Sequence, residues 1–244
     1  MYMNEIQKLK KAIDDSKKIV VFSGAGLSTN SGIPDFRSAS GIYNQKINMN
    51  VRPEEIISHS FFMTYPDEFY KFYFDKMVYL DAKPNKAHLY FAELEKKGKV
   101  SSVVTQNIDN LHQLAGSKNV IEIHGTVMKN HCMKCHKYYD LKDILDKGIP
   151  PRCDCGGLIK PDVVLYEEGL NEDDINKALD EISSCDMLII VGTSLVVYPA
   201  AGFVRYFNGK YLVLLNKSET QYDNNADIVI HDDVCHVVEE LEKL

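Results

Sequence analysis

Short apolar runs recur along the chain, and they limit its fold more than any other feature of the sequence. The clearest runs are residues 19–22, 186–191 and 211–215, where apolar side chains follow one another with almost no polar alternation. Such runs are typical of strands buried on both faces of a parallel sheet. Segments with apolar residues at helical spacing separate them, so we predict an α/β fold built on a doubly wound parallel sheet. A further short run at residues 163–166 is expected to resume the same alternation of strands and helices.

Glycine-rich or polar turns follow two of these runs. The first run leads into a Gly-Ala-Gly turn at residues 24–26, and the second ends in a Gly-Thr-Ser turn at residues 192–194. A Gly-x-Gly between a strand and a helix can hold a diphosphate on backbone N–H groups and the helix dipole. Thr29 replaces the expected third glycine, and no acidic residue ends a second strand about 20 residues later, so a purely structural turn is the alternative.

Residues 105–125 carry the candidate catalytic groups, because polar side chains leave one predicted strand and return on the next. Gln106, Asn107 and Asp109 follow the first of these strands, and His124 follows the second. A histidine with a pKa of about 6.5 can exchange a proton at neutral pH. We therefore place the chemistry here, although His124 taken alone would be better explained as a hydrogen-bonded histidine of the core at a strand end.

Two segments break the alternation of strands and helices. Residues 42–83 are rich in aromatic side chains at helical spacing, which predicts a helical module with a small core of its own. A second segment holds two close cysteine pairs, Cys132/Cys135 and Cys153/Cys155, which fit one tetrahedral zinc ion. Four thiolates leave no open position, so this zinc would be structural. The alternative ligands are the flanking histidines, His131 and His136.

Composition excludes several classes of function. A net charge of −7 and a pI near 5.6 argue against a general nucleic-acid binder. No apolar run approaches the roughly 20 residues of a membrane span, and charges interrupt the apolar residues near the N-terminus, so we expect neither a signal peptide nor an anchor. Close cysteine pairs without an export signal favour a metal over disulfides. We expect a cytoplasmic monomer that binds neither membranes nor nucleic acid.

The chain as a whole resembles the sirtuin family in its bacterial Sir2-type form. The resemblance spans nearly the whole chain and rests on motifs in the family's order: Gly24-Ala25-Gly26-Leu27-Ser28, Gly32-Ile33-Pro34-Asp35-Phe36-Arg37, Thr105-Gln106-Asn107-Ile108-Asp109, His124-Gly125, the two cysteine pairs and Gly192-Thr193-Ser194-Leu195. It implies an NAD-dependent protein lysine deacylase with a Rossmann-like large domain and an inserted small domain. The large domain would comprise residues 1–41, 84–126 and 162–244. The small domain would combine the helical module at 42–83 with a zinc ribbon at 127–161.

The same resemblance implies a role for individual residues. His124, Asn107 and Asp109 would be catalytic, and His112 would be structural. Backbone and side chains for the diphosphate and the nicotinamide ribose would come from Gly24, Ala25, Gly26, Thr29, Phe36 and Arg37. The nicotinamide pocket would be lined by Gln106, Asn107, Ile108 and Asp109. The adenosine would lie against Gly192, Thr193, Ser194, Asn216, Asp233 and Val234. The acyl-lysine substrate would pair with Val163, Val164, Leu165 and Tyr166.

The implied reaction consumes NAD as a substrate, which would account for the incomplete dinucleotide pattern. The acyl oxygen of the modified lysine attacks the ribose C1′ as nicotinamide leaves. His124 then acts as general base toward the ribose hydroxyls, and an O-acyl-ADP-ribose is released with the free lysine. Protein mono-ADP-ribosylation from the same NAD site is the rival reaction, and a zinc-ribbon binding module for a protein or nucleic acid is the rival outside enzymology.

The sequence departs from the family at two places. Residues 166–168 read Tyr-Glu-Glu where the family usually has Phe-Gly-Glu, and the added carboxylate would favour basic residues beside the substrate lysine. Residues 69–76 lack the Tyr-x-x-Arg pair that marks relatives acting on succinyl-lysine or malonyl-lysine. Because no arginine is placed to hold a second carboxylate, we expect acetyl or longer apolar acyl groups to be removed.

Overall fold

Six parallel strands form the larger of two sheets in the computed structural model, which describes residues 2–36, 41–42 and 51–244. The order across the sheet is β3-β2-β1-β7-β8-β9, with every neighbouring pair parallel. This arrangement confirms the predicted doubly wound sheet. The strands are β1 (Ile19–Ser23), β2 (Val100–Thr105), β3 (Val120–Glu122), β7 (Met187–Val191), β8 (Tyr211–Leu215) and β9 (Ile228–Ile230).

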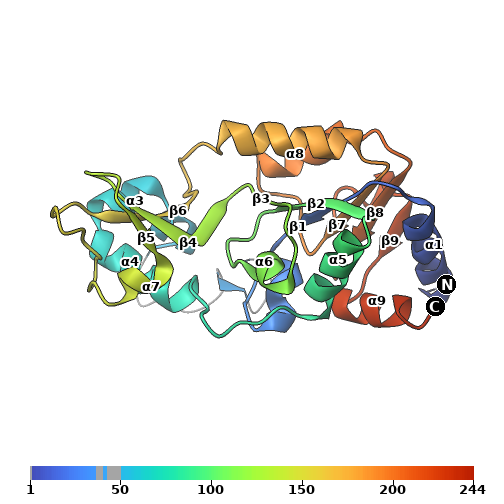
Figure 1. Ribbon diagram of the computed structural model, residues 1–244, viewed down its shortest axis with the longest axis horizontal. Helices are drawn as coiled ribbons and strands as arrows, with labels where there is room; N and C mark the ends of the chain where they lie inside the picture. Colours follow the sequence, from blue (N-terminus) through green and yellow to red (C-terminus); the bar gives the residue numbers. More distant parts are fainter. Residues whose placement is uncertain (1, 37–40, 43–50) are drawn as a thin grey trace.

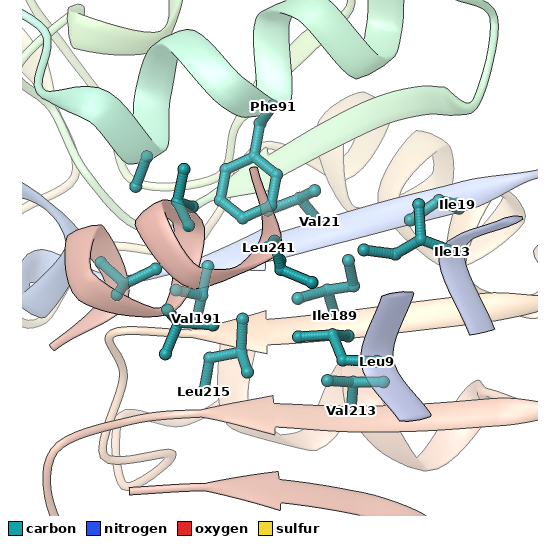
Figure 2. Close-up of a cluster of buried hydrophobic side chains, with 14 of the residues drawn as sticks. Leu9, Ile13, Ile19, Val21, Phe91, Ile189, Val191, Val213, Leu215 and Leu241 are labelled. Atoms are coloured by element: carbon teal, nitrogen blue, oxygen red, sulfur yellow. The ribbon is translucent and has the colours of Figure 1, made fainter. Parts of the chain in front are cut away.

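Helices cover both faces of this sheet, which explains why its strands are apolar without alternation. Ile19 and Val21 of β1 face one layer, and Val20 and Phe22 face the other. The first layer holds α1 (Tyr2–Asp15), α5 (Lys86–Lys96) and α9 (Val234–Leu241), and Figure 2 shows how Leu9, Phe91 and Leu241 meet the strands there. The second layer holds α8 (Glu172–Ser184) and η3 (Ala200–Tyr206).

The strand order reverses between β1 and β7. From β1 the chain builds outward through β2 and β3, and from β7 it builds in the opposite direction through β8 and β9. Ligands of open α/β sheets bind at such a reversal, outside the carboxyl ends of the strands. The two small-residue turns at 24–26 and 192–194 both lie there.

A second sheet of three antiparallel strands forms the smaller part of the molecule, on the left of Figure 1. Its order is β5-β4-β6, with β4 (Gly125–Cys132), β5 (Tyr138–Asp140) and β6 (Ile159–Val163). The helices beside it are α2 (Pro53–Ile56), α3 (His59–Thr64), α4 (Pro66–Lys76) and α7 (Leu141–Leu145).

The sequence suggested that the aromatic residues of the helical module form a core of their own, but they share one core with the small sheet. Phe69, Tyr70 and Tyr73 are fully buried in one cluster together with Val127 and Ile159 of the small sheet. The Tyr70 hydroxyl donates to the Ile159 carbonyl across this contact. The module and the sheet are therefore one packing unit, while the residue ranges proposed above for the domains stay a prediction.

Two other expectations need correction. The helix expected after the first glycine turn is a 3-10 helix, η1 (Ala25–Ser31). The apolar run at residues 163–166 does not return to the parallel sheet, because β6 ends at Val163 and pairs antiparallel with β4. Tyr166 instead bridges to Ser58 beside α3. Short apolar runs cannot distinguish a parallel from an antiparallel partner, and this one was assigned to the wrong sheet.

The remaining short elements are α6 (Leu111–Ala115) and η4 (Asp223–Asn225). Among the helices within the described residues, none is long and apolar enough to cross a membrane.

Candidate active site

The two glycine turns at the strand reversal pack backbone against backbone. The Gly24 N–H donates to the Val191 carbonyl at 3.0 Å, and the Gly26 N–H donates to the Gly192 carbonyl at 2.8 Å. Gly192 has a φ of +60°, and a Cβ added there would lie 2.3 Å from the Leu27 nitrogen. The close approach therefore requires glycine, and it fixes the first turn of η1 above the end of β7.

We expect Gly192→Ala to weaken NAD binding by at least about 10-fold and to destabilise the fold by roughly 1–3 kcal/mol, because the added methyl group must push η1 away and strain a positive φ. Calorimetric titration with NAD and thermal unfolding would measure the two effects. Gly202→Ala is the matched control, since a Cβ there meets no atom closer than 3.8 Å. An affinity equal to that of Gly202→Ala would contradict the expectation that this turn binds NAD.

Residues 106–109, here called the amide loop, run across the same end of the sheet. The Gln106 N–H donates to the Ser23 carbonyl at 2.9 Å, and the Gln106 side-chain amide donates to the Thr193 hydroxyl at 3.0 Å. The loop is thus tied to both β1 and the turn after β7. Thr193 also accepts the Leu195 N–H at 3.2 Å, which shapes that turn.

Ser28 joins Asn107 and Asp109, and the sequence analysis had not assigned it to the site. Its hydroxyl accepts from the Asn107 amide at 3.1 Å and donates to the Asp109 carboxylate at 2.6 Å. Burial raises the pKa of Asp109, and hydrogen bonds from Ser28 and from the Leu111 N–H partly offset that effect. The signal for Ser28 was a hydroxyl two residues after the second glycine, but its partners depend on the 3-10 geometry of η1.

His124 lies between the two sheets, after β3 and before β4. Its Nδ1 is 3.0 Å from the Gln106 carbonyl, which can only accept, so Nδ1 carries the proton of the neutral ring and Nε2 keeps a free lone pair. Burial lowers the pKa of His124 from its ordinary value, and the bond to Gln106 acts in the opposite direction. The ring is therefore a neutral base beside the amide loop.

Gly125 makes this position possible. It has a φ of +74°, and a Cβ would lie 1.8 Å from the Asp162 carbonyl oxygen. The chain can therefore turn from the large sheet into β4 directly after His124, and the His124 carbonyl accepts the Val164 N–H at 2.9 Å.

The predicted substrate strand meets the amide loop from the side of the small sheet. Val163 and Leu165 are buried in the aromatic cluster, and Ile108 and Phe36 pack against the same cluster. Tyr166 keeps 38% of its surface exposed.

The residues expected at the diphosphate and the nicotinamide ribose lie mainly in η1. Thr29 donates to the Gly26 carbonyl within this helix, and Ala25 is its first residue. Arg37 lies outside the described residues.

The residues expected at the adenosine lie farther along the same sheet edge. Thr193 is buried and Ser194 is exposed in the turn after β7, and Asn216 follows β8 directly. Asp233 caps α9, with its carboxylate accepting from the Cys235 N–H and the Asn30 amide and pairing with Lys217 at 2.8 Å. Val234 is buried beneath it. Contact of these residues with NAD stays a prediction.

The four predicted zinc ligands converge, with all their Sγ atoms within 4.8 Å of one another. The Cys132–Cys155 and Cys135–Cys153 Sγ distances are both 3.5 Å, too long for disulfides and close to the edge of about 3.8 Å expected for four thiolates 2.3 Å from one zinc ion. Backbone N–H groups and the Tyr139 hydroxyl donate to these sulfurs. The site therefore fits zinc.

The proposed alternative ligand His131 is engaged elsewhere. Its Nδ1 is 2.8 Å from the Asp162 carboxylate. Among the described residues, the group arranged to hold a metal consists of the four cysteines alone.

The unusual Glu167 is held by hydrogen bonds within the chain. It has a φ of +75°, the conformation favoured by the glycine that the family has there, and its carboxylate accepts from the Ser60 N–H and hydroxyl at 2.8 Å each. Glu168 pairs with Lys160 at 3.0 Å and with His59 at 2.8 Å. The idea that an added carboxylate attracts basic substrate residues loses support, because both carboxylates have partners within the chain.

A family model and curated bacterial proteins are similar to this chain over most of its length. A model described as the Sir2 family matches residues 24–199. An NAD-dependent protein deacetylase of Clostridium perfringens (strain 13 / Type A) is 57% identical over 96% of this chain and 97% of its own length. The protein of the same name in Clostridium acetobutylicum is 52% identical over 98% of each chain.

Solved Sir2 structures are also similar to this chain over nearly its whole length. A Sir2 variant with deacetylated p53 peptide and 3′-O-acetyl ADP-ribose is similar at a TM-score of 0.90 and 38% identity, covering 98% of this chain and 97% of that one. A Sir2 complex with p53 peptide and NAD⁺ has a TM-score of 0.86 at 39% identity, with the same coverage of both chains.

Proposed function

The chain belongs to the Sir2 family of NAD-dependent protein deacetylases, and we propose that the site at the β1/β7 reversal carries out this reaction with His124 as its general base. The protein removes acetyl groups from lysine side chains and consumes NAD. The observation that carries the assignment of the base is the Nδ1 contact of His124 with the Gln106 carbonyl, which leaves Nε2 free.

The other roles follow from position. The backbone N–H groups of η1 suit a diphosphate at the strand reversal, and the amide loop suits the nicotinamide carboxamide, because it offers amide and carboxylate groups held by Ser28. The turn after β7 and the capped start of α9 suit the adenosine. Residues 163–166 suit the substrate peptide, since the Val164 N–H donates to the His124 carbonyl and Ile108 packs against the cluster that contains Val163 and Leu165. Arg37 would act with Phe36 on the ribose side.

One experiment tests the reaction and its rival. Incubation with acetyl-lysine peptide and NAD carrying a label in the ADP-ribose part should release nicotinamide and labelled O-acetyl-ADP-ribose. Label retained on protein would instead support mono-ADP-ribosylation, which the comparisons do not favour. A succinyl-lysine peptide in the same assay should react much more slowly, and equal rates would overturn the preference for acetyl or apolar acyl groups.

The pH profile should reflect the lowered pKa of His124. The base works only when Nε2 is unprotonated, and a lowered pKa keeps it unprotonated to more acidic pH. We expect kcat/KM to stay level as the pH falls to about 6.5 and to decline only below it. Rates measured between about pH 5 and 9 check this, and an acidic half-point above 6.5 would show that burial does not control the base.

We also propose that the enzyme is a cytoplasmic monomer that acts on acylated proteins without contacting nucleic acid or membrane. Free thiols arranged for zinc suit a reducing compartment, and the negative net charge suits lysine-rich substrates better than phosphate backbones. Sedimentation and cell fractionation would test these points.

A further inference from the structure

A buried histidine that takes no part in the reaction is linked to the amide loop by hydrogen bonds. His112 Nε2 lies 2.9 Å from the Ser23 hydroxyl, and that hydroxyl lies 2.9 Å from the Thr105 hydroxyl. Ser23 and Thr105 are register partners at the ends of β1 and β2. The Thr105 oxygen in turn accepts the Asn107 N–H at 3.0 Å, so the chain of contacts reaches the loop.

A second route returns from the loop to the same helix. The Asn107 amide donates to Ser28, Ser28 donates to Asp109, and the Asp109 carboxylate accepts the Leu111 N–H at 2.9 Å. Leu111 directly precedes His112 at the start of α6. These hydrogen bonds and the Leu111–His112 peptide therefore form a closed ring that includes Asn107 and Asp109 of the amide loop. His112 is the member that joins α6 to the end of β1.

The part of this hydrogen-bonded ring around His112 is buried and selects one form of the imidazole. Ser23, Thr105 and His112 are each no more than 2% exposed. With the Ser23 hydroxyl donating to Thr105, the Ser23 oxygen is left to accept from an N–H at His112 Nε2. Burial, with a smaller effect from His88, lowers the pKa of His112 to about 3. The imidazole of His112 therefore stays neutral over the pH range in which the enzyme works.

His88 offers a contrast within the same contact. Its ring meets that of His112 edge-on at 5.0 Å between centroids, and it is fully buried. Its Nδ1 accepts the Asn85 N–H at the start of α5, so this hydrogen bond serves the helix cap and lies outside the hydrogen-bonded ring. The two histidines share burial and packing but differ in their connection to the amide loop.

We propose that His112 is a positioning residue for NAD, which acts through Ser23 and Thr105 to hold the Asn107 backbone and side chain where the nicotinamide carboxamide binds. The proposal rests on the proposed function of the amide loop. A displaced Asn107 backbone would pull the Asn107 side-chain amide away from the Ser28 hydroxyl, and that hydroxyl is one of the two donors that hold the Asp109 carboxylate. The cost should fall on the nicotinamide half of NAD and leave the peptide and the adenosine largely unaffected.

The test compares His112→Phe with His88→Phe. His112→Phe keeps a planar ring but removes the N–H, and we expect the KM for NAD to rise about 10-fold while the KM for acetyl peptide changes less than about 2-fold. Calorimetry should show the same loss for NAD but not for ADP-ribose, which lacks the nicotinamide. His112→Gln should restore part of the affinity, because its terminal amide can donate to Ser23. His88→Phe should lower the melting temperature without changing the KM or the affinity for NAD.

Thr105→Val removes the acceptor of the Asn107 N–H and keeps the proposal testable if His112→Phe does not fold. It should weaken NAD binding similarly, and the double variant should lose little more than the worse single one, since both break the same ring. A folded His112→Phe enzyme with wild-type NAD affinity, or an equal loss in His88→Phe, would reduce His112 to a core residue. Failure of the wild-type protein to bind NAD or release nicotinamide would instead overturn the proposed function itself.

Discussion

A His124→Ala enzyme should lose deacetylation by roughly 10²- to 10⁴-fold while still binding NAD, because a positioned general base contributes about that much to rate. The Nε2 lone pair of His124 has no substitute at the same place, since the two fully buried imidazoles, His88 and His112, contact each other and bond to Asn85 and Ser23. Single-turnover rates with acetyl peptide and calorimetric NAD affinities would separate chemistry from binding.

Two further variants sharpen the test. His124→Asn retains a side-chain donor able to reach the Gln106 carbonyl but offers no base, so it should be as inactive as His124→Ala if proton transfer is the role. His236→Ala removes an exposed histidine of α9 and should keep full activity. Loss of NAD affinity in His124→Ala would make the ring a ligand contact, and residual activity near wild type would place the base elsewhere.

The parallel sheet could be predicted because burial on both faces leaves a direct mark on the sequence. Ile19 and Val20 point into different helical layers, so neither can be polar, and the same holds along β7 and β8. Residues 163–166 carry a similar run but belong to the antiparallel sheet. What decides between these outcomes is the partner strand, and a short run contains no information about its partner.

The candidate site also contains some residues that the sequence could predict and others that depend on contacts in the folded chain. His124 and the amide loop could be placed at strand ends from the sequence, because the carboxyl ends of parallel strands gather at one edge. The role of Ser28 could not be foreseen, since it depends on two contacts that bring residues 28, 107 and 109 together. The Ser60 partner of Glu167 could not be foreseen for a related reason, because this contact exists only in the folded chain.

Removal of zinc should destabilise the protein more than any single substitution outside the cysteine cluster. Cys132 ends β4, and the cluster that buries it also contains α4 and β6, so the metal supports the wall against which Ile108 and Phe36 pack. Structural zinc sites contribute on the order of 10 kcal/mol in small domains, and even part of this would lower the melting temperature by about 10 °C or more.

Cys132→Ala, and the wild-type protein after treatment with a strong chelator, should show the same loss, because both abolish the four-thiolate shell. Elemental analysis should find one zinc per wild-type chain and none in the variant. Cys235→Ala is the matched control, since this half-buried thiol lies outside the cluster and its loss should leave both zinc content and melting temperature unchanged. If the zinc-free protein melted at the wild-type temperature, the aromatic cluster alone would be holding the small sheet, and the four thiols would not be a structural metal site.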